Sequence, residues 1–130
     1  IEGGLSEHSL GRLREILAQS RQDNVLIALH HQPILVDAPW IDRYPLSNPE
    51  PFLELVKSDP RIRCVTWGHI HHHFEAQRGG VMFLGSPSTA ANSVTGSARF
   101  DLDPAGPACR TLELGSSGSV VFGQLYGDEI

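Results

Sequence analysis

Apolar residues in the first half of the chain follow two patterns, one typical of a helix and one typical of buried strands. Four of them recur at helical spacing, namely Leu10, Leu13, Ile16 and Leu17. Ser6 is a good helix cap, so we predict a helix over residues 6–20. The continuous apolar runs Val25–Leu29 and 62–66 predict strands buried on both faces. A helix over 49–58, capped by Asn48, joins them and predicts parallel neighbours in an α/β layer.

The second half has a different pattern. Residues 74–77 and 81–84 flank Gly79-Gly80 and predict a hairpin. Further strands are expected over 98–102, 109–114 and 120–126, the last two joined by a turn at 115–119. Residues 1–4 are expected to be a flexible lead-in or a linker. The long segment 36–48 is expected to be a functional loop. The fold class is therefore α/β, a single domain with parallel strands first and antiparallel hairpins after.

Composition excludes several classes of function. The net charge is −5, with 10 basic and 15 acidic residues. Non-specific nucleic-acid binding needs clustered basic residues, so we expect no nucleic-acid partner. No apolar run is long enough to span a bilayer, so we expect no membrane partner. The two cysteines, Cys64 and Cys109, are too few for a disulfide scaffold. We expect free thiols in a cytoplasmic protein.

Histidines are concentrated at the ends of the two predicted apolar strands. Six of the seven lie in two clusters, 30–31 and 69–73. His69 and His71 are two apart, so in an extended segment they share one face. His30 follows the first strand directly, and the ends of parallel strands open onto one edge of the sheet. We expect His30, His69 and His71 to converge on a metal. The alternative is that each is an ordinary surface or core residue, as we expect for His72.

Several segments together resemble one enzyme family. His30-His31-Gln32-Pro33 followed by Gly68-His69-Ile70-His71 resembles the calcineurin-like metallophosphoesterases. The wider set is similar to the bacterial class III cyclic-AMP phosphodiesterases and adds four elements: Trp40-x-Asp42, Leu46-x-Asn48, Pro87-Ser88-Thr89 and Thr111-Leu112-Glu113-Leu114. The resemblance runs from Gly4 to about Val121. It implies the C-terminal portion of an αββα two-sheet sandwich.

The resemblance also implies a function and a ligand set. The expected reaction is hydrolysis of 3′,5′-cyclic nucleotides, cyclic AMP above all, by attack of a metal-activated hydroxide on phosphorus. His30 and His69 would bind one metal and His71 a second. Histidine suits Fe, Mn, Zn or Co, so the metals stay open. Trp40, Asp42 and Tyr44 are expected to form a lid over the nucleotide, because an aromatic ring can stack on a base. His31 is a further candidate for substrate contact, and no side chain is expected to take a direct part in catalysis. A loop anchored by its own aromatic residue is the alternative for Trp40 and Asp42.

The family's other metal-binding motifs do not occur in this sequence. It contains no Asp-x-His and no Gly-Asn-His, and its one Gly-Asp is Gly127-Asp128. The N-terminal metal-binding half is therefore expected to be absent. The chain by itself is expected to be inactive, to bind one metal ion or none, and to self-associate through the surface that this half would cover. Two alternatives stay open: another phosphodiester or phosphomonoester as substrate, or a non-catalytic metal-binding module.

Overall fold

The computed structural model describes residues 3–129 and contains two helices and eight strands within them. The elements in chain order are β1 (Gly3–Gly4), α1 (Glu7–Gln19), β2 (Val25–Leu29), β3 (Leu46–Ser47), α2 (Glu50–Ser58), β4 (Ile62–Trp67), β5 (Phe74–Arg78), β6 (Val81–Gly85), β7 (Ala108–Leu114) and β8 (Val120–Tyr126). Ser6 caps α1, as predicted, by accepting a hydrogen bond from the Ser9 amide at 3.1 Å.

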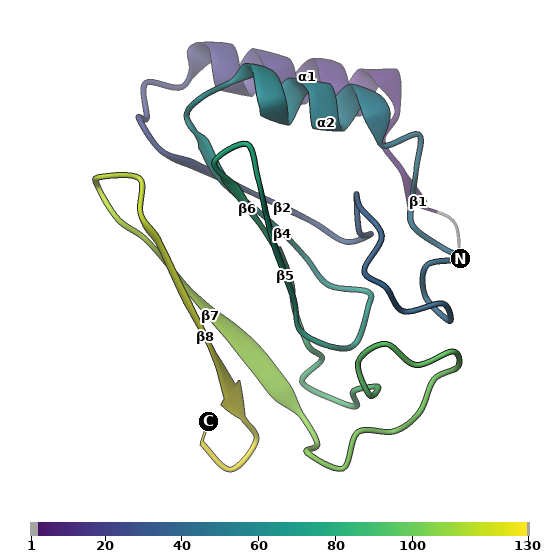
Figure 1. Ribbon diagram of the computed structural model, residues 1–130. Coiled ribbons are helices and arrows are strands. Elements are labelled where there is room, and N and C mark those ends of the chain that lie inside the picture. Colours follow the sequence, from purple (N-terminus) through teal and green to yellow (C-terminus); the bar gives the residue numbers. More distant parts are fainter. Residues whose placement is uncertain (1–2, 130) are drawn as a thin grey trace.

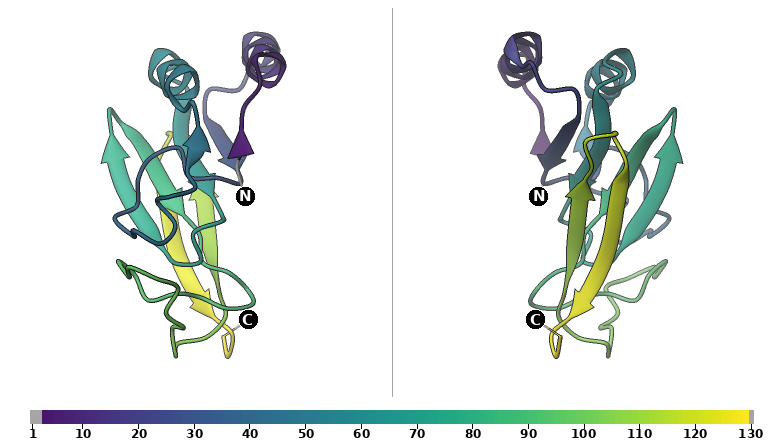
Figure 2. Two further views of the ribbon diagram at one scale, coloured as in Figure 1. Left: turned by 90° about the vertical axis from the view of Figure 1, so that its right-hand side faces the viewer. Right: turned by 90° about the vertical axis from the view of Figure 1, so that its left-hand side faces the viewer.

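The elements form three layers (Figure 1). The middle layer is a four-stranded sheet in the order β2-β4-β6-β5, in which β2, β4 and β6 are parallel and β5 is antiparallel to β6. The helices cover one face of this sheet and lie side by side (Figure 2). The antiparallel hairpin β7–β8 lies over the other face. The predicted α/β class is confirmed, with parallel strands first and antiparallel hairpins after.

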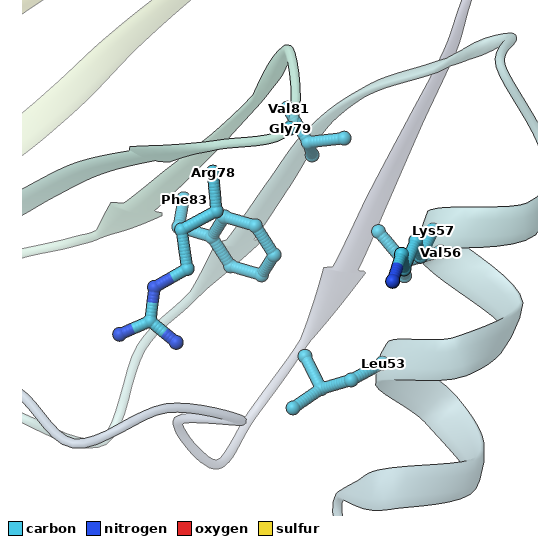
Figure 3. A pocket seen from close by; sticks show the side chains of 7 residues that line it. All are labelled: Leu53, Val56, Lys57, Arg78, Gly79, Val81 and Phe83. Carbon is cyan, nitrogen blue, oxygen red and sulfur yellow. The ribbon is translucent and has the colours of Figure 1, made fainter.

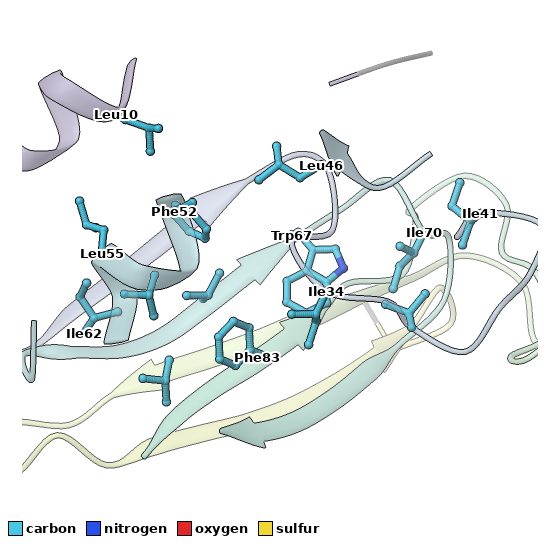
Figure 4. Packing of buried hydrophobic residues seen from close by; sticks show 14 of the residues in the cluster. Leu10, Ile34, Ile41, Leu46, Phe52, Leu55, Ile62, Trp67, Ile70 and Phe83 are labelled. Atoms are coloured by element: carbon cyan, nitrogen blue, oxygen red, sulfur yellow. The ribbon is translucent and has the colours of Figure 1, made fainter. Parts of the chain in front are cut away.

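The main hydrophobic core lies between the helices and the four-stranded sheet (Figure 4). Large buried side chains from both layers fill it, including Leu10, Phe52, Leu55, Ile62, Trp67 and Phe83. The strand β4 is central in the sheet, and four of its six residues are buried. This packing fixes where β4 ends, and therefore where the histidines that follow it lie.

The prediction that both apolar strands are covered on both faces is right for β4 and wrong for β2. No residue of β2 is fully buried, and Ala28 is exposed. The reason is position in the sheet, because among the described residues β2 pairs only with β4. The other edge of β2 presents unpaired backbone groups to solvent.

Three further predictions need correction. Asn48 does not cap α2, because its backbone is left-handed (φ 49°) and Pro49 occupies the cap position. Residues 98–102 do not form a strand, and only an isolated bridge joins Ser93 and Leu102. Gly3 and Gly4 are not a loose lead-in, because they pair in parallel with Leu46–Ser47 of β3. The remainder of the expected lead-in, residues 1–2, lies outside the described residues.

Arg61 ties the C-terminal end of α1 to the start of β4. Its guanidinium donates to the Leu17 and Ser20 carbonyls at 2.8 and 2.9 Å, which α1 leaves without helical partners. It also forms a two-pronged ion pair with Asp59. The hydrogen bond from Arg61 holds the pKa of Asp59 below its ordinary value. The Asp59 contribution to stability is therefore complete at neutral pH and is lost on strong acidification.

We expect Arg61→Ala to lower the midpoint of thermal unfolding by several degrees, because two helix carbonyls and a carboxylate lose their donor together. Arg61→Lys should recover little, since an ammonium cannot reproduce the planar fork. Arg12→Ala is the matched control. It breaks the Arg12–Glu15 pair, whose side chains are 61% and 59% exposed, and should shift the midpoint little. Circular dichroism melts check this, and equal shifts for Arg61→Ala and Arg12→Ala would contradict it.

Candidate metal centre

The parallel register of β2 and β4 brings the two histidine clusters together. Leu29 at the end of β2 pairs with Trp67 at the end of β4, and His30 and Gly68 follow directly. The ring centroid of His69 lies 5.1 Å from that of His30 and 4.2 Å from that of His31. The predicted meeting of the two clusters at one sheet edge is therefore present in the structure.

The shared face expected for His69 and His71 depends on an extended segment, and the prediction that this segment is extended is wrong. The segment after β4 is not extended but turns sharply, with the Ile70 amide donating to the Gly68 carbonyl at 2.6 Å. His69 and His71 both have left-handed backbone, with φ of 61° and 53°. This conformation is unfavourable for a residue with a Cβ, and such strain is concentrated at functional sites. The turn leaves Ile70 fully buried between the two histidines.

His69 is held in the form that can bind a metal. Burial lowers its pKa to about 4, with smaller contributions from the neighbouring His31, His30 and His71. Its ring is therefore neutral at physiological pH, as a metal ligand requires. Its Nε2 is buried and has no hydrogen-bond partner among the described residues. A buried ring nitrogen without a partner is unfavourable unless something else satisfies it.

His71 is oriented by a backbone carbonyl. Its Nδ1 lies 2.7 Å from the Ala91 carbonyl oxygen. Because a carbonyl only accepts, Nδ1 carries a proton, and Nε2 is the ring nitrogen left to bind a metal. This is the usual arrangement of a metal-binding histidine. His72 is more deeply buried, at 3% exposed, and its Nδ1 likewise donates to a backbone carbonyl, that of Ile70 at 2.8 Å. Its Nε2 is also buried without a partner in the described part of the chain. His72 has a place in the packing of the turn, while His73 is exposed.

These residues fit part of a metal centre. The fit rests on the orphaned Nε2 of His69 and on the oriented ring of His71. Within residues 3–129, however, no three His, Cys, Asp or Glu side chains are already arranged around one metal position. The ligand roles of His30, His69 and His71 therefore stay predictions.

His31 is packed beneath β1. A Cβ placed on Gly3 would overlap the His31 ring, so only glycine fits there without a shift. Burial, followed by the charge of His30, lowers the pKa of His31, and its Nε2 has no partner in the described part of the chain. Contact of His31 with substrate stays a prediction.

We expect Gly3→Ala to displace either the His31 ring or strand β1, and so to change the His31 imidazole signals in a long-range ¹H–¹⁵N NMR spectrum. A small loss of stability, about 1–3 kcal/mol, should accompany this as in other overpacked sites. Gly4→Ala is the control, because its Cβ would make an ordinary 3.4 Å contact with Ser47 Oγ. Unchanged His31 signals in Gly3→Ala would contradict the packing described here.

The side chain of Asp42 holds the loop 36–48 together. The Asp42 carboxylate accepts hydrogen bonds from the Val36 amide at 3.0 Å and the Ala38 amide at 3.1 Å, and so closes the loop on itself. This favours the structural alternative for Asp42. Trp40 lies 6.5 Å from His71 between ring centroids, and its indole N–H is buried without an acceptor among residues 3–129. Substrate contact stays a prediction for both residues.

An apolar pocket lies away from the histidines (Figure 3). It has a volume of about 310 Å³ and lies between α2 and the β5–β6 turn. Its lining is mostly apolar and contains Leu53, Val56, Lys57, Arg78, Gly79, Val81 and Phe83. No histidine or carboxylate lines it, so it does not supply the ligands that the site at the strand ends does.

The chain is similar to known phosphodiesterases over most of its length. No family model matches the chain. The 3′,5′-cyclic adenosine monophosphate phosphodiesterase CpdA of Pseudomonas aeruginosa is 34% identical over 130 residues, which is 100% of this chain and 48% of that protein. A 3′,5′-cyclic-nucleotide phosphodiesterase of Nostoc is 36% identical over 119 residues, covering 92% of this chain and 45% of that protein. The chain thus spans about half the length of these relatives.

A solved structure has a similar fold. The dimetal phosphatase of Danio rerio matches 63% of this chain and 26% of its own, with a TM-score of 0.51 and 25% identity. Together these similarities support the resemblance to the calcineurin-like metallophosphoesterases, and the chain matches about half the length of the curated relatives. The two histidine clusters are among the segments that resemble this family. The parallel sheet brings them together.

Sequence patterns assigned no role to two residues near His71. Asn92 is 4% exposed and holds the loop that carries the Ala91 carbonyl. Phe100 lies 5.3 Å from Trp40 and 6.0 Å from His71 between ring centroids. Neither belongs to a periodic segment, so their positions follow from tertiary structure alone. The one sequence signal at Phe100 is its aromatic side chain.

Proposed function

We propose that this chain is part of a metal-dependent phosphodiesterase that hydrolyses 3′,5′-cyclic nucleotides, with cyclic AMP as the first candidate. The observation that carries the proposal is the 34% identity with CpdA over the complete chain. The meeting of His30, His31 and His69 at the ends of β2 and β4 supports it. The Asp-x-His and Gly-Asn-His motifs that this sequence lacks would lie in the N-terminal metal-binding half of the parent protein.

The chain's own residues would orient ligands and keep them neutral. His30 and His69 would hold one metal ion and His71 the other, with Fe, Mn, Zn and Co all compatible with imidazole. When bound, two metal ions supply an activated water and positive charge for in-line attack on phosphorus. Burial keeps His69 neutral, and the Ala91 carbonyl fixes which nitrogen His71 presents. The similarity to the dimetal phosphatase of Danio rerio supports a two-metal centre.

Hydrolysis by the full-length parent tests this function. Cyclic AMP, with Mn²⁺ or Fe²⁺ supplied, should give 5′-AMP, and removal of the metal by a chelator should stop the reaction. Turnover of phosphomonoesters with none of cyclic nucleotides would instead favour another substrate on the same fold. Metal binding without turnover of any phosphoester would favour the non-catalytic module.

We also propose that the parent protein acts in the cytoplasm. Cys64 and Cys109 are both free, as expected, which agrees with a reducing compartment. Among the described residues, no helix is long and apolar enough to cross a membrane.

Self-association of the isolated chain follows from the surface that the other half would cover. Strand β2 has an edge without a partner in the described structure, and Val121 and Leu125 of β8 are 60% and 37% exposed. Exposed strand edges and apolar side chains favour pairing with a second copy. We expect analytical ultracentrifugation of residues 1–130 at micromolar concentration to show a dimer. A monomer whose mass does not change with concentration would contradict this.

A further inference from the structure

The loop that follows β6 is built directly on His71. The Ala91 carbonyl accepts from His71 Nδ1, and the Ser93 amide donates to the His71 carbonyl, both at 2.7 Å. Two consecutive attachments, one on each side of residue 92, fix this loop relative to the predicted metal ligand. Its place is not set by sheet or helix, because residues 86–107 contain neither.

Asn92 holds the same loop from the other side. Its Oδ1 accepts from the Ser88 amide at 2.6 Å, and its Nδ2 donates to the Ser88 and Gly106 carbonyls at 2.9 and 2.8 Å. A side chain that is 4% exposed and fully hydrogen-bonded is a rigid anchor. The segment between Asn92 and Gly106 therefore leaves and re-enters the structure at fixed points.

Within this segment the chain returns on itself and brings Phe100 over His71. The Val94 amide donates to the Asp101 carbonyl at 2.8 Å, and Ser93 bridges Leu102. The Phe100 ring lies 6.0 Å from His71 at 78° and 5.3 Å from Trp40 at 89°. Three rings from three separate segments thus meet edge-to-face, a favoured aromatic arrangement.

Phe100 is 45% exposed, although its ring is beside a predicted metal ligand. An exposed aromatic residue at a site is a surface on which a flat ring can stack. A cyclic nucleotide presents a phosphate and, a short distance away, a flat nucleobase. A phosphate held beside His71 would leave the base within reach of Phe100 and Trp40.

We propose that Phe100 and Trp40 form the site for the nucleobase, an inference that rests on the proposed cyclic-nucleotide function. The loop 91–103, anchored on His71, sets the distance between this aromatic pair and the phosphate. Val94 and Leu102 of the same loop are also exposed, at 40% and 65%, but neither takes part in the ring cluster. Leu102 therefore serves as the matched control.

The test compares two ligands that differ by the base alone. Binding of adenosine 5′-monophosphate and of ribose 5-phosphate to the metal-loaded, full-length parent is measured by isothermal titration calorimetry. Phe100→Ala should weaken binding of the adenosine nucleotide by about tenfold or more, in line with base stacking on aromatic side chains. Binding of ribose 5-phosphate should not change. Phe100→Leu keeps an apolar side chain of similar size and should still lose the base-dependent part, while Leu102→Ala should leave both affinities intact.

Other outcomes overturn the inference. An equal loss for both ligands, or the same loss in Leu102→Ala, would show that the loop acts through packing. A parent that hydrolyses cyclic AMP yet binds the two ligands equally would refute this inference and leave the proposed function standing. A parent that hydrolyses no cyclic nucleotide would refute the proposed function, and the comparison of the two ligands would still decide whether Phe100 binds a base.

Discussion

Replacing His69 by alanine in the full-length parent should lower kcat/KM for cyclic AMP by about 100-fold or more, since loss of even an outer partner of a metal ligand costs about 10–100-fold. His69 is the histidine with the most ligand-like environment. It is neutral because burial lowers its pKa to about 4, and its Nε2 has no partner in the described structure. His71→Ala should have a comparable effect, because the Ala91 carbonyl orients that ring for ligation.

The control for these substitutions lies in the same turn. His73 is exposed and takes part in none of the ring contacts of the cluster, so His73→Ala should retain activity. Metal content, measured by inductively coupled plasma mass spectrometry, should fall in His69→Ala and not in His73→Ala. Full activity and full metal content in His69→Ala would remove this residue from the centre.

The second large effect is a difference in cyclic AMP hydrolysis between the isolated chain and its full-length parent. Residues 1–130 alone, supplied with Mn²⁺ or Fe²⁺, should not hydrolyse cyclic AMP above background. The sequence offers imidazoles but no Asp-x-His, no Gly-Asn-His and no Gly-Asp near the histidines. Two cations close together without a bridging carboxylate would repel each other.

The parent, assayed beside residues 1–130, provides the positive control. A chelator-treated sample and a His69→Ala sample of the short chain provide the background. Metal-dependent turnover by residues 1–130 that disappears in His69→Ala would contradict the account, because it would show that these imidazoles suffice.

Short sequence patterns predicted the strands β2 and β4 and the hairpin β5–β6, because apolar runs and turn residues determine them locally. The apolar runs gave β2 and β4, and the rule for parallel strands brought His30 and His69 to one edge, where their rings lie 5.1 Å apart. The hairpin β5–β6 followed from Gly79-Gly80, and both glycines have left-handed backbone, with φ of 56° and 82°.

The remainder depends on tertiary structure that no short pattern encodes. The pairing of β1 with β3 involves two residues on each side and joins segments more than 40 positions apart. The left-handed turn at His69 and His71 is imposed on residues that do not favour it. Phe100 reaches the site through hydrogen bonds of Ser93 and Val94 rather than through a strand, which is why the strand predicted over 98–102 is wrong.

The position of the metals in the full-length parent decides whether His30, His69 and His71 are ligands. Crystals of the full-length parent grown with Mn²⁺ or Zn²⁺ should show anomalous difference peaks at the ends of β2 and β4. With zinc, ring nitrogens of His30, His69 and His71 should lie about 2.0–2.1 Å from a metal. Peaks confined to other residues, or bonded to His31 with His30 turned away, would contradict it.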